Sequence, residues 1–174
     1  PKRQALAVIT LVAALVAAPA FAKPPIEAFG EAPEIRSMQL SPDGAKAVFI
    51  AAKNDVQQVM LYDFATKKQD PLATVGDFKA RSVYFINGDY VALVASKTTR
   101  DTGWGTNRYE DSSTYAINTK TKKSVQLLTR TSNLWPVQSG LHQIAGADPG
   151  GKYVYMPAFT TNGHLTSGPS SDLL

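Results

Sequence analysis

The sequence predicts an all-β protein, and three observations carry this prediction. Short runs of β-branched and aromatic residues alternate with turn signals along most of the chain. No stretch shows the sustained i, i+3, i+4, i+7 apolar pattern of a helix. The runs also recur in a similar order: the first two corresponding turns lie about 45 residues apart, and the next spacing is longer by roughly the length of an inserted polar stretch, which suits repeated four-stranded sheets.

Composition limits the class of protein before any motif is considered. The chain has 174 residues, of which 44% are hydrophobic and 18% are charged, a balance typical of globular proteins with a buried core. It has no cysteine, so stability must come from packing and not from disulfides. The net charge is +4, and the basic residues are scattered over turns, so we expect no nucleic-acid partner.

Residues 1–22 are predicted to form a signal peptide. A basic start is followed by an apolar run from Ala5 to Ala18, and Ala20-Phe21-Ala22 supplies a small-x-small cleavage pattern. A membrane-spanning helix is the alternative, but it needs about 20 apolar residues and Pro19 ends this run early. Cleavage after Ala22 predicts a periplasmic or secreted protein without a stable membrane span.

A proline-rich segment, residues 23–34, precedes the first predicted sheet unit, residues 35–75. The tight turn Ser41-Pro42-Asp43-Gly44 joins its first two strands, because proline presets φ, aspartate bonds nearby amides and glycine accepts a positive φ. The expected strands are Ile35–Leu40, Ala47–Ala52, Val56–Tyr62 and an outer strand Gln69–Ala73. Together they predict one four-stranded antiparallel unit.

The second predicted unit, residues 80–130, repeats this order. Its first turn contains Asn87-Gly88, a strong hairpin signal. A polar stretch, residues 97–112, is expected to be a loop inserted between its second and third strands. The expected strands are Ser82–Ile86, Tyr90–Ala95, Ser113–Ile117 and Ser124–Leu128.

A third unit is predicted to start within residues 140–174. His142–Gly146 and Lys152–Met156 flank the turn Asp148-Pro149-Gly150-Gly151, after which the pattern fades and no terminal strand is expected. Four-stranded repeats bury their apolar faces by stacking around an axis, so residues 35–174 are predicted to be an incomplete β-propeller domain of about two to three blades. Because propellers typically have at least about four blades, we expect the chain to be the amino-terminal piece of a longer protein. A small complete sandwich of about eight to ten strands is the alternative.

The motifs resemble those of a known family. The segments Ile35–Asp55 (IRSMQLSPDGAKAVFIAAKND) and Val59–Leu72 (VMLYDFATKKQDPL), placed after an export signal, are similar to the start of exported bacterial serine peptidases of the prolyl oligopeptidase family. The turn at Ser41 is shared with other propellers, including that of the Tol-system translocation protein. The resemblance implies a propeller that caps an α/β-hydrolase domain, with peptide substrates and a Ser, Asp, His triad beyond Leu174.

No catalytic, cofactor-binding or metal-ligating residue is predicted in this chain. The Gly-x-Ser-x-Gly elbow is absent from the sequence. His142 and His164 lack neighbouring ligands for a metal, and Glu110-Asp111 lacks the spacing of a calcium loop, so solvated positions are expected. Trp104, in the polar stretch, is the best candidate for recognition, although a packing role is favoured for Trp104 and also for Trp135.

These observations lead to one hypothesis for function, with alternatives. The leading hypothesis is the propeller portion of an exported serine peptidase, which gates peptide access to a hydrolase domain missing from this chain. The alternative is a non-catalytic periplasmic propeller that binds envelope proteins. A short product that binds envelope partners through exposed blade edges is a further possibility.

Overall fold

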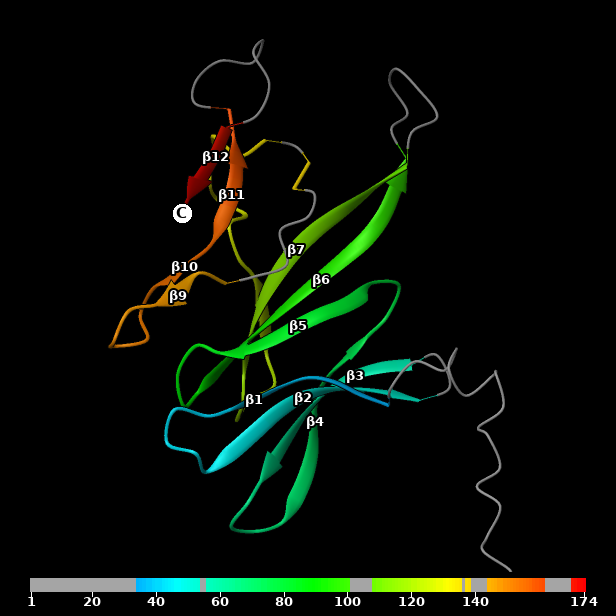
Figure 1. The fold of residues 1–174 in the computed structure, drawn as a ribbon, viewed down its shortest axis with the longest axis vertical. Coiled ribbons are helices and arrows are strands. Elements are labelled where there is room, and N and C mark those ends of the chain that lie inside the picture. Colours follow the sequence, from blue (N-terminus) through cyan, green and yellow to red (C-terminus); the bar gives the residue numbers. More distant parts are fainter. Residues whose placement is uncertain (1–33, 54–55, 101–107, 136, 139–143, 162–169) are drawn as a thin grey trace, which may run out of the picture. The chain divides into compact units, whose positions relative to one another are not determined.

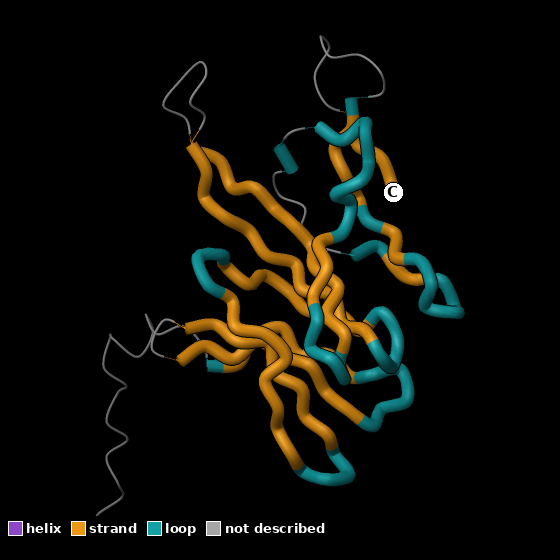
Figure 2. The backbone as a smooth tube through the Cα atoms, turned by 180° about the vertical axis from the view of Figure 1, so that it is seen from behind, coloured by secondary structure: helices purple, strands orange, loops and turns teal. Residues whose placement is uncertain are grey.

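Strands and tight turns make up the secondary structure of the described residues. The computed structural model of the chain describes residues 34–53, 56–100, 108–135, 137–138, 144–161 and 170–174. Within these ranges Figure 2 shows strands and loops and no helix. The described segments thus include no helix that is long and apolar enough to cross a membrane. The predicted signal peptide lies outside the described residues.

Four consecutive strands form one antiparallel sheet, the first blade, with the order β1-β2-β3-β4 (Figure 1). The strands are β1 (Ile35–Leu40), β2 (Lys46–Lys53), β3 (Val56–Asp63) and β4 (Lys68–Val75). Side chains alternate between the two faces of a strand, so Val48, Ile50 and Val59 share one face, and all three are fully buried there. The four predicted strands of the first unit are therefore observed.

The next four strands form a second antiparallel sheet, the second blade, in the order β5-β6-β7-β8. The strands are β5 (Lys79–Phe85), β6 (Tyr90–Arg100), β7 (Arg108–Asn118) and β8 (Ser124–Gln126). The prediction of an inserted loop at 97–112 is wrong for the residues of this stretch that the structure describes. Residues 97–100 continue β6 and residues 108–112 belong to β7, and the two strands pair in one unbroken register up to Arg100 and Arg108. Alternating polar residues on two paired strands can be solvated without forming a loop.

The three turns that begin the units use the same chemistry. In the first blade the Ser41 hydroxyl donates to the Asp43 carboxylate at 2.6 Å, and the Ala45 N–H donates to it at 3.0 Å. These two bonds, led by the Ser41 hydroxyl, hold the pKa of Asp43 below its usual range. The Asn87 side chain accepts from the backbone of its own turn, and the Asp148 carboxylate does the same in the third unit.

The two blades pack face to face through one apolar core. The shared cluster contains Val48, Ile50, Val59, Leu72 and Val75 from the first blade and Ala80, Val83, Val91, Leu93, Ala95 and Ile117 from the second. β5 lies against β1 and β2 in this arrangement (Figure 1). Burial of these side chains is the main source of stability for the pair of blades.

Side chains of the first blade also bond the free edge of β5. Ser37 Oγ accepts from the Val83 N–H at 2.9 Å, and Gln57 Oε1 accepts from the Ala80 N–H at 2.7 Å. Gln39 Oε1 accepts from a further N–H of β5, that of Phe85. Ser37 lies in an irregular step of β1, with φ at 48°, which directs its hydroxyl towards β5. The edge of the second blade is thus capped by the blade before it.

Two short sheets follow the second blade, and we call residues 144–174 the third unit. Its strands are β9 (Gly146–Ala147), β10 (Val154–Tyr155), β11 (Pro157–Thr160) and β12 (Ser170–Leu173). β9 pairs with β10, and β11 pairs with β12. The expectation that the chain lacks a terminal strand is therefore wrong, because β12 pairs along the full length of β11 despite its small polar residues.

Candidate binding pocket

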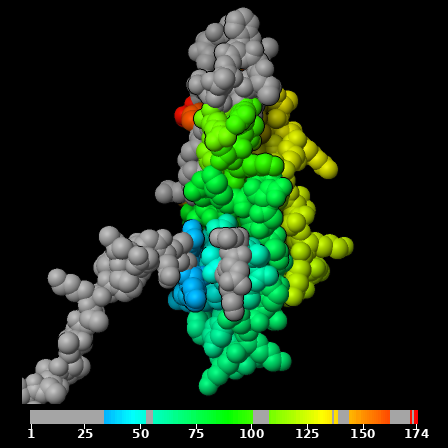
Figure 3. All heavy atoms as spheres, turned by 90° about the vertical axis from the view of Figure 1, so that its right-hand side faces the viewer, coloured from blue at the N-terminus to red at the C-terminus, as the bar shows by residue number. Residues whose placement is uncertain are grey.

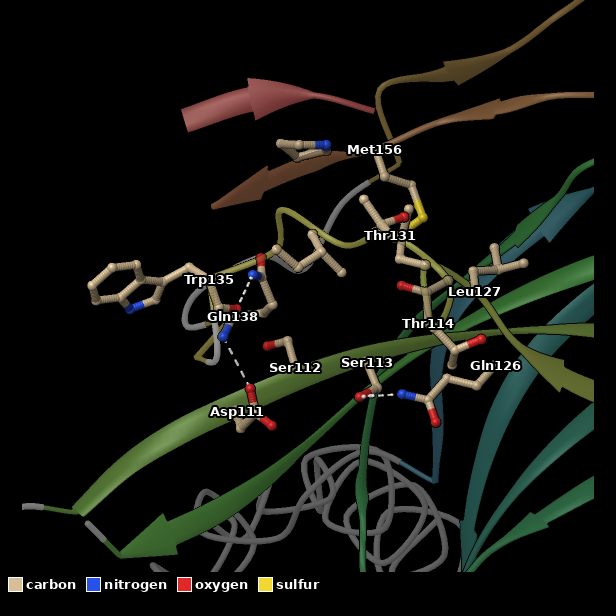
Figure 4. Close-up of a pocket in the computed structure, with 14 residues that line it drawn as sticks. Asp111, Ser112, Ser113, Thr114, Gln126, Leu127, Thr131, Trp135, Gln138 and Met156 are labelled. Atoms are coloured by element: carbon tan, nitrogen blue, oxygen red, sulfur yellow. Dashed lines mark hydrogen bonds between the residues drawn. The ribbon is translucent and has the colours of Figure 1, made fainter. Parts of the chain in front are cut away.

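The candidate pocket lies where β7 extends beyond its outer neighbour. β8 pairs with β7 only from Tyr115 to Ile117, so the first half of β7 is left for other partners. The connection that follows β8, yellow in Figure 3, lies along one side of the second blade. A pocket of about 300 Å³ lies between this connection, β7 and the start of β11 (Figure 4).

The wall of the pocket combines hydroxyl groups with apolar side chains. The hydroxyls belong to Ser112, Ser113, Thr114, Thr129 and Thr131, and the apolar residues are Leu127, Leu128, Leu134, Met156 and Pro157. Ser112 and Thr114 are buried, and Leu127 N–H donates to the Thr114 carbonyl at 2.8 Å. At the other end, Gln126 Nε2 donates to Ser113 Oγ at 3.3 Å (Figure 4). The mixture suits a ligand with both polar and apolar groups.

Gln138 joins the second blade to the third unit at the edge of the pocket. Its N–H donates to the Asp111 carboxylate at 3.0 Å, and its carbonyl accepts from the Ser112 N–H at the same distance. Its side-chain amide donates to the Trp135 and Phe159 carbonyls at 2.7 and 2.8 Å, and accepts from the Phe159 N–H at 2.8 Å. This one residue therefore fixes β7, the connection and β11 relative to one another.

An ionic cluster joins β5 to the β6–β7 hairpin, near the end of the hairpin where Thr98 pairs with Glu110. Glu110 Oε1 lies 2.7 Å from Arg81 Nη2 and 3.1 Å from Lys79 Nζ. The hydroxyls of Ser96 and Thr98 donate to the same carboxylate at 2.7 and 2.8 Å. These hydroxyls, followed by Arg81, lower the pKa of Glu110 to about 2. A carboxylate that stays ionised at neutral pH stabilises structure and is unsuited to proton transfer.

The structure places some of the residues that the sequence singled out. Glu110 and Asp111 lie on β7 and not in a solvated loop, and neighbouring positions on a strand point to opposite faces. Trp135 is half-buried, its N–H donates to the Phe159 carbonyl at 2.8 Å, and Figure 4 shows its ring directed away from the other labelled side chains. Trp104, His142 and His164 lie outside the described residues.

Sequence reasoning missed several residues of this site, above all Gln138 and the partners of Glu110. The sequence signal that could have found them is the polar stretch at 97–112. Its residues are compatible with a continuation of the two strands on either side, and not only with a loop. The described residues contain no group of three or more histidine, cysteine or acidic side chains that could hold a metal ion.

Comparison with known proteins shows similarity of fold. No protein-family model matches the chain, and no curated protein matches it either. A solved structure from Clostridium novyi NT, described as a candidate conserved lipoprotein, superposes with a TM-score of 0.52 at 10% identity, covering 83% of this chain and 88% of that one. At this identity the likeness concerns the fold alone.

Two larger proteins resemble the chain more distantly. TolB from Acinetobacter baumannii gives a TM-score of 0.49 at 15% identity, covering 80% of this chain and 28% of TolB. An acylaminoacyl peptidase from Pyrococcus horikoshii gives 0.43 at 15% identity, covering 82% of this chain and 25% of the peptidase. The chain therefore spans about a quarter of the length of these two proteins.

The class of protein follows from the sheets and their packing. Two four-stranded antiparallel sheets with the same strand order pack face to face, and a third unit begins with the same turn chemistry. One apolar face of each sheet packs against the other sheet, which is the arrangement of propeller blades. The chain is an all-β protein with the fold of a partial β-propeller.

Proposed function

We propose that this chain is the amino-terminal propeller portion of an exported serine peptidase that resembles the prolyl oligopeptidase family. In this proposal the blades gate peptide access to a hydrolase domain that is missing from these residues. The observation that carries it is the face-to-face stacking of blades through Ser37, Gln57 and the shared apolar core, together with the Ser41 to Gly44 turn on which the family resemblance depends.

The candidate pocket supports a peptide as the ligand of such a propeller. A peptide presents amides that need hydrogen-bond partners and side chains that favour apolar contact. The pocket offers both, since Ser113 and Thr131 carry hydroxyls and Met156 and Leu127 provide apolar surface. Gln138 anchors the wall, so the pocket is held in place before a ligand arrives.

The same proposal places the protein in the periplasm or outside the cell. Its basis is the apolar run from Ala5 to Ala18 followed by Ala20-Phe21-Ala22. Amino-terminal sequencing of the protein isolated from an exporting bacterium is expected to read from Lys23. A mature envelope protein that retains the apolar segment would contradict export by signal cleavage.

The decisive experiment is to read the coding sequence beyond Leu174 and to assay the encoded protein. Further blades followed by a Gly-x-Ser-x-Gly elbow, an aspartate and a histidine are expected, together with labelling by a fluorophosphonate and cleavage of short chromogenic peptides. Further blades without an elbow, and no labelling, would overturn the peptidase proposal. That result would favour a non-catalytic propeller that binds envelope proteins.

A further inference from the structure

A second pocket lies between the two blades, away from the candidate pocket. Its volume is about 330 Å³, within the lower range of small-ligand sites. One wall is the end of β4 with the connection from Gly76 to Phe78. The opposite wall comes from β6, β7 and Ser124, so both blades build the pocket.

The floor of this inter-blade pocket is the apolar core itself. Leu93, Ala95 and Ile117 line it and are 5%, 1% and 0% exposed, and all three belong to the core cluster. Val75, also a member of that cluster, contributes from the first blade. Core side chains are close-packed and hold their positions, so the pocket is formed without a ligand.

Aromatic rings and a cation lie beside the pocket. Phe78 lines it with 38% of its surface exposed, so its ring is accessible to a ligand. The Phe78 and Tyr115 rings meet edge to face, with centroids 6.3 Å apart and planes at 69°. Lys97 Nζ lies 5.6 Å from the centroid of the Phe78 ring. A ligand ring placed here can make an edge-to-face contact with an aromatic side chain and a cation–π contact with the lysine.

We propose that this pocket binds a single aromatic side chain of an extended peptide. The apolar floor removes the ring from water, and Phe78 and Tyr115 offer it edge-to-face contacts. Thr74, Asp77 and Ser124 supply hydrogen-bonding groups for the adjoining peptide backbone. The inference rests on the proposed function in taking a peptide as the ligand, and it gives that peptide a preferred side chain.

The test is a titration of the full chain with N-acetyl-phenylalaninamide, followed by NMR. Saturable shifts are expected at the methyl groups of Ala95 and Ile117 and at the Tyr115 ring, with a dissociation constant of about 1 mM. N-acetyl-alaninamide is expected to leave these signals unchanged, because it has no ring to bury. Absence of saturable shifts with the phenylalanine probe, or equal shifts with both probes, would overturn the proposal.

A matched pair of glycine variants locates the site. A Cβ at Gly76 or at Gly88 meets no atom within 4 Å, so a side chain can start at either position without a clash, but only Gly76 lines the pocket. Gly76→Leu is expected to weaken binding about tenfold, while Gly88→Leu leaves it unchanged. Phe78→Leu, which keeps apolar bulk without the ring, is expected to weaken binding as well. Undiminished binding in both Gly76→Leu and Phe78→Leu would refute the assignment.

These measurements are independent of catalysis, so the two proposals can fail separately. Failure to bind the phenylalanine probe overturns the pocket assignment and leaves the peptidase proposal standing. A coding sequence without a hydrolase elbow overturns the peptidase proposal, whereas a saturable shift at Ile117 still supports the aromatic pocket.

Discussion

The contact between the two blades and the contact between the second blade and the third unit are made by different means. The first is mainly an apolar core, in which Val48, Ile50 and Val83 are at most 1% exposed, and side-chain hydrogen bonds are added only along the edge of β5. The second depends on hydrogen bonds of Gln138 and Asn87, and Met156 and Ala158 are the buried apolar side chains among the described residues of the third unit. Apolar burial is insensitive to direction, whereas hydrogen bonds fix orientation.

The difference has a consequence for where ligands can bind. A contact held by a few oriented hydrogen bonds leaves space beside them, and the hydroxyl-lined pocket of about 300 Å³ lies against the second contact. At the first contact, the aromatic pocket opens between the end of β4 and strands β6 and β7. The polar contact therefore positions the candidate site, and the apolar contact supports the fold.

The largest expected effect comes from the apolar contact. Ile50→Ala removes a fully buried side chain from the core between the blades and is expected to lower the free energy of unfolding by about 2–5 kcal/mol. The same change at Ile35, which is 50% exposed, is expected to cost much less. Denaturant unfolding of both variants measures the difference, and equal losses would mean that the blades do not pack as described.

Disruption of the polar contact is expected to have a smaller and more local effect. Gln138→Ala deletes the side-chain bonds to Trp135 and Phe159 and is expected to cost about 1–3 kcal/mol. Hydrogen exchange should accelerate at the Phe159 amide while the amides of β2 stay protected. Gln126→Ala, which removes one exposed bond to Ser113, is the matched control and should leave both regions unchanged.

A third change tests whether hydrogen bonds matter at the apolar contact too. Gln57→Ala leaves the Ala80 N–H without its acceptor at the edge of β5 and is expected to cost about 1 kcal/mol. Gln58→Ala, one position along β3, removes only an exposed bond to Thr74 and should cost less than about 0.5 kcal/mol. Thermal unfolding of the pair gives the comparison. If the two variants lose the same free energy of unfolding, the hydrogen bond from the Ala80 N–H to Gln57 contributes nothing specific to stability.

Local chemistry made the turns and strands predictable from sequence. Ser41 to Gly44 and Asn87 carry their own hydrogen-bonding groups, and the short apolar runs around Val48 and Val91, each next to such a turn, are typical of buried strands. These features involve neighbours in the chain. They can therefore be recognised in the sequence before any tertiary structure is known.

The site was less predictable because its residues meet across the fold. Gln138 has no distinctive sequence context, and its partners Asp111 and Phe159 belong to different units. Glu110 looked solvated because Arg81 and Ser96, its partners, come from two other strands. The charged and hydroxyl residues after Ala95 resembled a loop, although their pairing continued the sheet. Long-range partners of polar residues leave no local pattern.

The smallest expected effect concerns the cluster that holds the β6–β7 hairpin, and it depends on pH. The pKa of Glu110 in the folded protein is about 2, below the ordinary value of 4.5. Ionised Glu110 therefore adds stability that is present above pH 4.5 and is lost as the pH falls towards 2. The pKa values of Asp43 and Asp63 are also lowered, so these two carboxylates contribute to the same loss of stability at acid pH.

The contribution of Glu110 is isolated by comparing wild type with Glu110→Gln over this range. The variant should be less stable than wild type at pH 7, and the gap should close towards pH 2, because protonated glutamate resembles glutamine in charge. The gap should also shrink in about 1 M salt, since the cluster with Lys79 and Arg81 is partly solvated. A gap that persists unchanged at acid pH would assign the loss to packing and not to the charge of Glu110.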